Sequence, residues 1–221
     1  MFKKLVRLIV ICLLITHVIN HVNNLQCSGV TKKALLKTDL VEIQKINPSI
    51  KIDVRYATKN NFTGKVLYNS ARAFARRGTA EKLDAIQKEL AEKKLGLKVW
   101  DCYRPRSVQY KMWEIFPLPD LVADPKKGSK HNRGSAVDLT LVSLVDGKEL
   151  EMPTPFDELT ERAGSDYATG ISKRAIANRT LLKTVMVKNG FTSLKSEWWH
   201  FDDNDWESYE LMDVPFEELE C

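Results

Sequence analysis

Two short motifs constrain this chain more than any other feature, because they hold every histidine outside its N-terminal segment. The first, residues 129–138, reads Ser-Lys-His-Asn-Arg-Gly-Ser-Ala-Val-Asp, and the second, residues 197–200, reads Glu-Trp-Trp-His. The chain has four histidines, and the other two lie near its start: His17 and His21. Histidine and acidic side chains in separate short motifs are typical of a metal site that folding assembles from distant parts of a chain.

The residue types in these motifs favour zinc. A catalytic zinc ion takes three protein ligands and keeps a fourth position for water, beside a carboxylate that accepts a proton. His131, Asp138 and His200 supply two imidazoles and a carboxylate, and Glu197 supplies the acid. The alternative is a pair of histidines satisfied by hydrogen bonds in a polar loop, with Asp138 in a structural role. The Glu-x-x-His spacing and the break at Gly134 favour the metal site, so we expect one zinc ion per chain.

The composition indicates one folded domain that does not depend on disulfides. With 43% apolar and 9% aromatic residues, the chain can bury a core of ordinary size. Its net charge is +5, but three of the basic residues lie within residues 1–27, which carry no acid. The small remaining excess is interleaved with acids and provides no basic surface for nucleic acid. We therefore expect no nucleic-acid partner, and nothing in the sequence implies a protein partner.

Residues 1–27 have the order of a secretory signal, in which basic residues precede an apolar run. The run ends well short of the ~20 apolar residues that cross a bilayer comfortably. An uncleaved N-terminal anchor is one alternative, and a lipid-modified Cys27 is another, although the residues before Cys27 suit that modification poorly. Any membrane contact would come from this segment. We predict an exported protein, periplasmic or secreted, whose folded domain spans residues 28–221.

Periodicity in the rest of the chain predicts a mixture of helices and strands. Helices are expected where apolar residues recur at helical spacing between capping signals: residues 79–94 with Thr79 as N-cap and Gly96 just beyond the end, 107–116 and 172–189. Strands are expected where apolar residues alternate or cluster: residues 40–43, 50–54, 97–100, 136–141 and 191–201. The last strand would carry Glu197 and His200. Because residues three apart in a straight strand face opposite ways, we expect a bend between these two.

The same motifs carry a family resemblance. Ser-x-His-x-x-Gly-x-Ala-x-Asp over residues 129–138, with Glu-x-Trp-His at residues 197–200, resembles the D-alanyl-D-alanine metallopeptidases, and more closely the zinc D-alanyl-D-alanine dipeptidases of the VanX type. Further segments resemble this family in the same order along the chain: residues 53–58, 61–64, 100–105 and 196–200. The resemblance extends over residues 41–202, and four separate motifs in one order argue against chance agreement.

The resemblance implies a role for each matching residue, including roles that the sequence pattern alone does not assign. The zinc ligands would be His131, Asp138 and His200. Glu197 would be the general base, which takes a proton from the attacking water and passes it to the leaving amine. Arg104 would steady the negative oxygen of the tetrahedral intermediate, and Asp157 would hold the free ammonium group of a dipeptide. Ser129 would either contact substrate or shape the turn.

Cys102 departs from the family pattern, because it stands where a glycine usually precedes Tyr-Arg-Pro. Its side chain would either tighten the pocket near Arg104 or form a disulfide that alters the placement of Arg104. Cys221 is the partner for such a bond in an oxidising compartment, whereas a small buried thiol is the other reading. Neither cysteine has a cysteine or histidine close to it in the sequence, so we expect no thiolate zinc site.

The resemblance implies a single α+β domain of the hedgehog and D,D-peptidase type, with a central, mainly antiparallel sheet flanked by helices and zinc in a cleft on one sheet face. Its implied activity is hydrolysis of the dipeptide D-alanyl-D-alanine to two D-alanines. A D,D-carboxypeptidase or endopeptidase of the same fold, acting on cell-wall peptides, would keep the zinc but need an open cleft. A catalytically silent module that retains zinc for structure is the third reading, which the presence of Glu197 and Arg104 opposes.

Overall fold

The computed structural model describes residues 39–119 and 122–220. The expected signal segment, residues 1–27, lies outside the described residues, and so does Cys221. Residues 39–213 form one compact unit, which contains every residue that the sequence assigns to the site. The short helix α6, Glu217–Glu220, belongs to a second unit. Within the described residues, no helix combines the length and the apolar character needed to cross a membrane.

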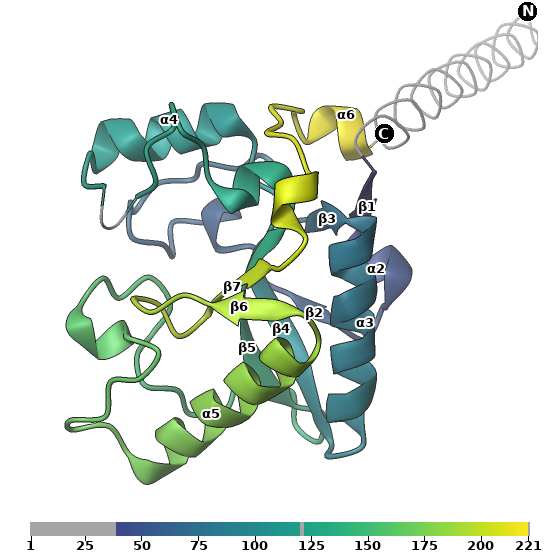
Figure 1. Ribbon diagram of the computed structural model, residues 1–221, viewed down its shortest axis with the longest axis vertical. Coiled ribbons are helices and arrows are strands. Elements are labelled where there is room, and N and C mark those ends of the chain that lie inside the picture. The colour runs from purple at the N-terminus through teal and green to yellow at the C-terminus, as the bar shows by residue number, and fades with distance from the viewer. Residues whose placement is uncertain (1–38, 120–121, 221) are drawn as a thin grey trace, which may run out of the picture. The chain divides into compact units, whose positions relative to one another are not determined.

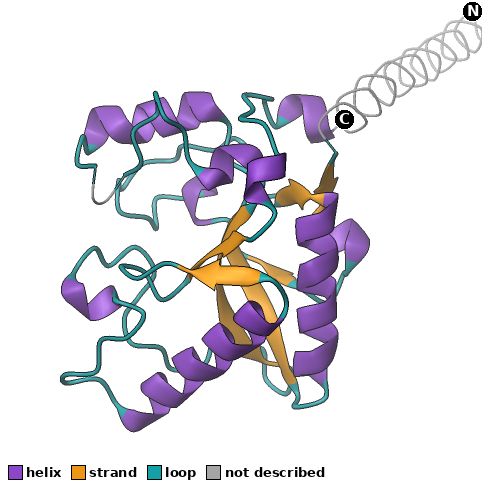
Figure 2. Cartoon of the chain, in the orientation of Figure 1, coloured by secondary structure: helices purple, strands orange, loops and turns teal. Residues whose placement is uncertain are grey.

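Five of the strands in the larger unit form one sheet in the order β2-β4-β5-β7-β6. Strands are drawn in orange in Figure 2. The strands of this sheet are β2 Lys51–Ile52, β4 Leu95–Asp101, β5 Ala136–Ser143, β7 His200–Asp203 and β6 Phe191–Ser193. Strand β2 runs parallel to β4, and the other neighbours in this sheet are antiparallel. Two further strands, β1 Leu40–Glu42 and β3 Phe74–Arg76, pair antiparallel with each other. The prediction of an α+β domain with a mainly antiparallel sheet is therefore confirmed.

Helices lie beside the sheet and contribute to its core (Figure 1). Their bounds are α2 Ile43–Ile46, α3 Arg77–Ala91, α4 Arg106–Ile115 and α5 Lys173–Lys188, with 3-10 turns η1 Arg55–Ala57, η2 Lys130–Arg133, η3 Glu161–Ala163 and η4 Trp206–Ser208. Helix α3 packs along β4, and α5 packs against β6. Leu83, Ile86 and Leu90 recur at helical spacing on α3 and are buried. This apolar stripe explains why the segment folds as a helix against the sheet.

The start and end of α3 differ from the expectation. The helix begins at Arg77 rather than Thr79, and no described side chain caps it. The Thr79 hydroxyl instead donates a hydrogen bond to Asp203 Oδ2 at 2.7 Å, so tertiary packing uses the group that was expected to cap the helix. Gly96 lies inside β4, where a Cβ atom would come within 2.9 Å of neighbouring side chains. The chain turns into β4 at Lys94, whose φ of 58° is left-handed.

The single strand predicted over residues 191–201 is wrong. The chain forms β6, turns through residues 194–199 and returns as β7, which pairs antiparallel with β6. Trp198 and Trp199 lie in the turn rather than in a strand, and each is 1% exposed. The Trp198 indole N–H donates to Thr154 Oγ1 at 2.9 Å. These aromatic residues therefore indicate burial rather than strand, and the bend expected before His200 is this turn.

Strand β5 carries Asp138 through the middle of the sheet. The predicted alternation along the strand is present, with Val137 and Leu139 on one face and Asp138 and Thr140 on the other. Both faces are buried, since Asp138 is 3% exposed and Thr140 is fully buried. A buried carboxylate is costly unless it is paired or hydrogen-bonded. Asp138 therefore needs polar or charged partners.

Gly134 ends η2, the turn that carries His131, and its substitution tests how tightly this turn is packed. Its φ is 70°, and a Cβ atom would lie 2.7 Å from Leu40 Cδ2 and 3.3 Å from the Arg76 backbone nitrogen. Gly134→Ala should lower the free energy of unfolding by roughly 2–4 kcal/mol, because left-handed strain and overpacking add. Gly147→Ala is the matched control, since Gly147 has a φ of 72° and no described atom within 4 Å of its Cβ position. Chemical denaturation compares the two variants, and equal losses would contradict tight packing at Gly134.

Candidate metal centre and active site

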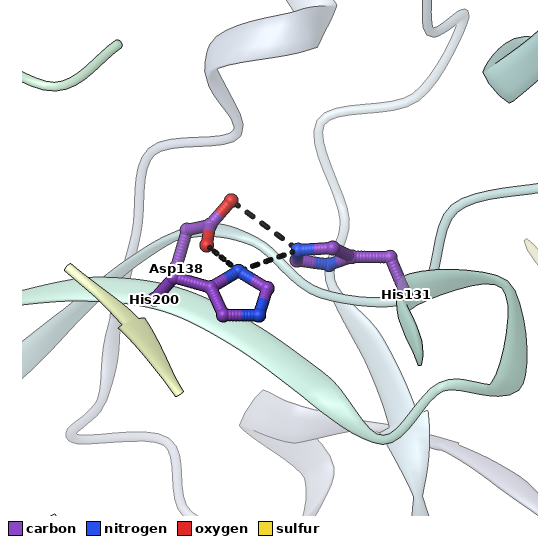
Figure 3. Close-up of side chains that lie close together, drawn as sticks. All are labelled: His131, Asp138 and His200. Carbon is purple, nitrogen blue, oxygen red and sulfur yellow. Dashed lines mark hydrogen bonds and ion pairs between the residues drawn. The ribbon is translucent and has the colours of Figure 1, made fainter. Parts of the chain in front are cut away.

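The three predicted ligands converge from three separate elements (Figure 3). Asp138 on β5 and His200 on β7 lie directly opposite each other in the antiparallel register. His131 reaches the same point from η2. One ligand atom from each residue lies within 4.8 Å of the others. The sheet register therefore fixes two members of the group, and the turn supplies the third.

The facing atoms of this group are close together. His200 Nδ1 lies 2.9 Å from Asp138 Oδ1 and 3.3 Å from His131 Nε2. His131 Nε2 lies 3.5 Å from Asp138 Oδ2. Burial raises the pKa of Asp138, but the two imidazoles outweigh burial and hold that pKa below its ordinary value. An ionised carboxylate beside two imidazoles is a donor set that suits zinc.

Outer hydrogen bonds orient both imidazole rings. His131 Nδ1 lies 2.7 Å from the Cys102 carbonyl oxygen, which can only accept, so Nδ1 carries the proton and Nε2 is left to bind a metal. His200 Nε2 lies 3.0 Å from Asp202 Oδ1, which accepts a proton held on Nε2, while Nδ1 faces Asp138. With a metal ion at Nδ1, the ring proton would stay on Nε2. Such outer partners commonly fix the tautomer of metal-binding histidines. The donor set therefore fits a zinc ion.

His200 is flanked by an acid at each ring nitrogen. Burial lowers the pKa of His200, but its hydrogen bonds to Asp138 and Asp202 outweigh burial and raise that pKa well above its ordinary value. The surroundings of this ring thus favour positive charge. A metal ion at Nδ1 would supply that charge in place of a proton.

Glu197 lies in the turn before β7, beside the three converging residues. Its Oε2 is 3.9 Å from His200 Nδ1, and its backbone carbonyl accepts from the His200 N–H at 3.4 Å. Burial raises the pKa of Glu197, and the charge of Asp138 adds to the rise, while nearby cationic groups oppose it. A carboxylate with a raised pKa is a stronger base than an ordinary glutamate.

Arg104 follows β4 and is held from three sides. Its Nη2 donates to Asp101 Oδ2 at 2.6 Å, and its Nη1 donates to Gln109 Oε1 at 2.7 Å. The backbone N–H of Arg104 donates to the His131 carbonyl at 3.1 Å, which ties the arginine to the metal motif. Its guanidinium carbon lies 5.2 Å from the centre of the Tyr56 ring. Burial lowers the pKa of Arg104, but Asp101 outweighs burial and keeps that pKa well above its ordinary value.

Asp157 lies in the loop before η3 and faces two donors. Its φ of 61° is uncommon for a residue with a side chain. The Tyr56 hydroxyl donates to Oδ1 at 3.2 Å, and the Phe62 backbone N–H donates to Oδ2 at 3.1 Å. Burial raises the pKa of Asp157 to about 8 in spite of the Phe62 hydrogen bond. An acid in such surroundings would be stabilised as a carboxylate by an incoming cation.

Ser129 caps the turn that carries His131. Its Oγ accepts from the His131 backbone N–H at 3.2 Å, and its own backbone N–H donates to Asn132 Oδ1 at 2.8 Å. Ser129 and Asn132 also form a capping box, in which the side chain of each accepts from the backbone N–H of the other. The structure thus supports the turn-shaping reading of Ser129, and substrate contact stays a prediction.

Cys102 is 2% exposed, which agrees with the reading of a small buried thiol. Burial raises the pKa of this thiol well above its ordinary value. Its contribution to the site comes from its backbone carbonyl, which orients His131. A disulfide to Cys221 stays a prediction, because Cys221 lies outside the described residues.

One cavity of about 350 Å³ joins these groups. Every residue that the sequence assigns to the site lines it: Arg104, Ser129, His131, Asp138, Asp157, Glu197 and His200. Apolar side chains complete its walls, among them Phe62, Met112 and Val122. A cavity of this size is suited to a small ligand.

Sequence reasoning missed the acids that support the site. Asp101 is 1% exposed, accepts from Arg104, and also accepts from the Tyr68 hydroxyl at 2.7 Å. Asp202 is 5% exposed and contacts His200. A local signal was available for each. Asp101 lies three residues before the arginine, and Asp202 lies two residues after the histidine, on the same side of a strand.

The α+β domain brings a His-Asp-His group that could hold a metal ion, and a glutamate, together in one cavity. A family model described as D-ala-D-ala dipeptidase matches residues 36–218. A D-alanyl-D-alanine dipeptidase of Escherichia coli strain K12 is 36% identical over 178 residues, which cover 79% of this chain and 90% of the relative. One of Enterococcus faecalis is 33% identical over 187 residues, covering 76% and 88%. The chain belongs to the D-alanyl-D-alanine dipeptidase family.

Among solved structures, the LdcB LD-carboxypeptidase is similar over 82% of this chain and 77% of that chain. Its TM-score is 0.44 and its sequence identity is 17%.

Proposed function

We propose that this protein hydrolyses D-alanyl-D-alanine to two D-alanines, with one zinc ion as cofactor. The observation that carries the proposal is the single cavity in which all the implied binding and catalytic residues meet. Relatives that are D-alanyl-D-alanine dipeptidases, similar over most of their own length, support the choice of substrate.

His131 Nε2, Asp138 and His200 Nδ1 are the atoms and groups that would hold the zinc. They converge, and the hydrogen bonds to Cys102 and Asp202 leave those ring nitrogens directed at the common point. When bound, zinc polarises a carbonyl group and makes water more acidic.

Glu197 is the proton carrier in this proposal. It takes a proton from the attacking water, whose oxygen bonds to the peptide carbonyl carbon. It then gives that proton to the amide nitrogen as the carbon–nitrogen bond breaks. One D-alanine leaves with the new amino group, and the other carries the new carboxylate. The proximity of Glu197 to His200, at 3.9 Å, supports this placement over the reacting group.

Arg104 meets the negative oxygen that develops on the carbonyl. Its hydrogen bonds to Asp101 and Gln109 fix the guanidinium before substrate arrives, so little reorganisation is needed during the reaction. Arg104 stays positively charged because the buried carboxylate of Asp101 forms an ion pair with it.

Asp157 binds the ammonium group of the free dipeptide, and this gives a pH-dependent prediction. Its pKa of about 8 means that the carboxylate forms as pH rises through 8. Affinity for the dipeptide should therefore increase up to about pH 8 and fall above it, as the α-amino group of pKa roughly 8 loses its proton. Asp157→Asn should raise KM for D-alanyl-D-alanine by roughly 10- to 100-fold, the loss expected when a hydrogen bond to a charged group is removed. The variant should also lose the increase in affinity between acidic pH and pH 8. KM measured across pH 6–10 tests both expectations.

N-acetyl-D-alanyl-D-alanine is the control substrate, because it lacks the ammonium group. Asp157→Asn should change KM for this compound far less than for the free dipeptide. Equal effects on the two substrates would remove the assignment of Asp157.

The experiment that tests the function compares two substrates on zinc-loaded protein. Release of D-alanine from D-alanyl-D-alanine should exceed release from a muramyl pentapeptide that ends in the same dipeptide, because the walls of the cavity leave room for a small ligand. Preference for the pentapeptide would favour the carboxypeptidase reading. A protein that binds zinc and releases D-alanine from neither substrate would favour the catalytically silent module.

The reaction takes place outside the cytoplasm in this proposal. Its support is the signal-like order of charge and apolar residues near the start of the sequence.

A further inference from the structure

Asp202 links the two histidine motifs through its carboxylate. Its Oδ1 lies 3.0 Å from His200 Nε2, and its Oδ2 accepts from Lys130 Nζ at 2.7 Å. His200 and Asp202 are two residues apart on β7, so they project from the same face of the strand. Lys130 directly precedes His131 on η2. The carboxylate therefore bridges one candidate ligand and the turn that carries another.

The Asp202 end of the bridge is shielded from solvent, and the Lys130 end, whose side chain is 35% exposed, lies against an aromatic ring. The Asp202 side chain is 8% exposed, so water screens its interactions weakly. Lys130 Nζ lies 4.9 Å from the centre of the Trp206 ring, and the guanidinium carbon of Arg133 lies 5.3 Å from the same centre. Cations are attracted to an aromatic face, so Trp206 restrains the Lys130 end of the bridge.

We propose that Asp202 and Lys130 are positioning residues that set the zinc affinity of the site, an inference that rests on the proposed function. Asp202 keeps the ring proton of His200 on Nε2, which leaves the Nδ1 lone pair for the metal. Lys130 holds the carboxylate in place and ties η2 to β7. Without this bridge, the His200 ring loses its fixed tautomer and orientation while the ligand set itself is intact.

Zinc affinity, measured by competition with a chromophoric chelator, tests the inference. Asp202→Ala should weaken zinc binding by roughly 10- to 100-fold, the usual effect of losing an outer partner of a metal ligand. Asp202→Asn keeps an oxygen that accepts from Nε2–H and should recover most of that loss. Lys130→Met leaves the carboxylate without its anchor and should fall between Asp202→Asn and Asp202→Ala.

Lys82→Met is the matched control, because Lys82 on α3 pairs with the residue that follows Asp202 on β7. Lys82 Nζ pairs with Asp203 Oδ1 at 2.5 Å, and Asp203 follows Asp202 on β7 with its side chain on the opposite face. The substitution removes the same kind of ion pair without touching His200. Zinc affinity should be unchanged in Lys82→Met, even where thermal melts show lower stability.

The imidazole N–H signal of His200 in ¹⁵N-labelled, zinc-loaded protein is a second readout, which a general loss of stability would not move. The Nε2 proton should be protected from solvent exchange in wild type and Asp202→Asn, and unprotected in Asp202→Ala.

Asp202→Ala that binds zinc as tightly as wild type would overturn the inference. An equal loss of zinc affinity in Lys82→Met and Asp202→Ala would also overturn it. Should Asp202→Ala fail to fold, unchanged zinc affinity in Lys130→Met would overturn it instead. Wild-type protein that binds no zinc would contradict the proposed function itself. Failure of the proposed function can therefore be distinguished from failure of the positioning role of Asp202 and Lys130.

Discussion

Glu197→Gln should slow release of D-alanine by about 10²- to 10⁴-fold, the contribution of a positioned general base. Glutamine keeps the shape of the side chain but cannot accept the proton of the attacking water. Zinc affinity should stay close to that of the wild type, because Glu197 lies beside the three converging residues and is not one of them. The measurements are kcat by a coupled D-alanine assay and zinc content by elemental analysis.

Glu161→Gln is the control for this substitution, since Glu161 is an exposed acid of the nearby turn η3. The rate of D-alanine release by Glu161→Gln should match that of the wild type. A Glu197→Gln protein that keeps more than a tenth of the wild-type rate would contradict the role of the base. Loss of zinc from that protein would instead reassign Glu197 as a ligand.

Arg104→Lys should lower kcat by about 10²- to 10³-fold with a smaller change in KM, as expected for loss of an oxyanion partner. Lysine keeps a positive charge beside the buried Asp101 but cannot direct separate N–H groups at Asp101, Gln109 and the substrate. Alanine would be less informative, because it leaves Asp101 unpaired in the interior at a cost of about 3–5 kcal/mol. Steady-state kinetics on the folded lysine variant separate the two parameters.

Arg106→Lys provides the matched control for Arg104→Lys. Arg106 is two residues further along and donates to the Pro125 and Lys126 carbonyls rather than to the site. Its kcat should be close to that of wild type. If both lysine variants lose activity equally, or if the loss in Arg104→Lys is entirely in KM, the oxyanion role is wrong.

The metal group is the part of the site that the sequence predicted best. His131, Asp138 and His200 lie in short motifs, and the regular register of β5 and β7 brings two of them face to face. Side-chain chemistry and strand periodicity were enough to foresee this convergence. Arg104 and Asp157 needed the family resemblance, because a lone arginine or a loop acid has no local signature.

Errors arose where tertiary packing overrides local preference. The aromatic pair Trp198 and Trp199 resembles strand sequence but is buried in a turn. Thr79 resembles an N-cap but hydrogen-bonds to Asp203 on a distant strand. The left-handed conformation of Asp157 is likewise invisible in the sequence, because surrounding structure imposes it.

The supporting acids were missed for a related reason. Asp101 and Asp202 are buried acids whose hydrogen bonds to Arg104, His200 and Lys130 exist only in the folded chain. In a chain with many charged residues, such acids resemble ordinary surface residues until burial is known. Their spacing from a site residue gives a hint, but only the structure shows which acids turn inward.

A zinc titration of the metal-free protein, with D-alanine release from D-alanyl-D-alanine recorded at each step, tests the central claim most directly. Activity should rise linearly and stop at one zinc per chain, while His200→Ala treated in the same way stays inactive. Full activity before any zinc is added, or none at any loading of a folded protein, would contradict the account.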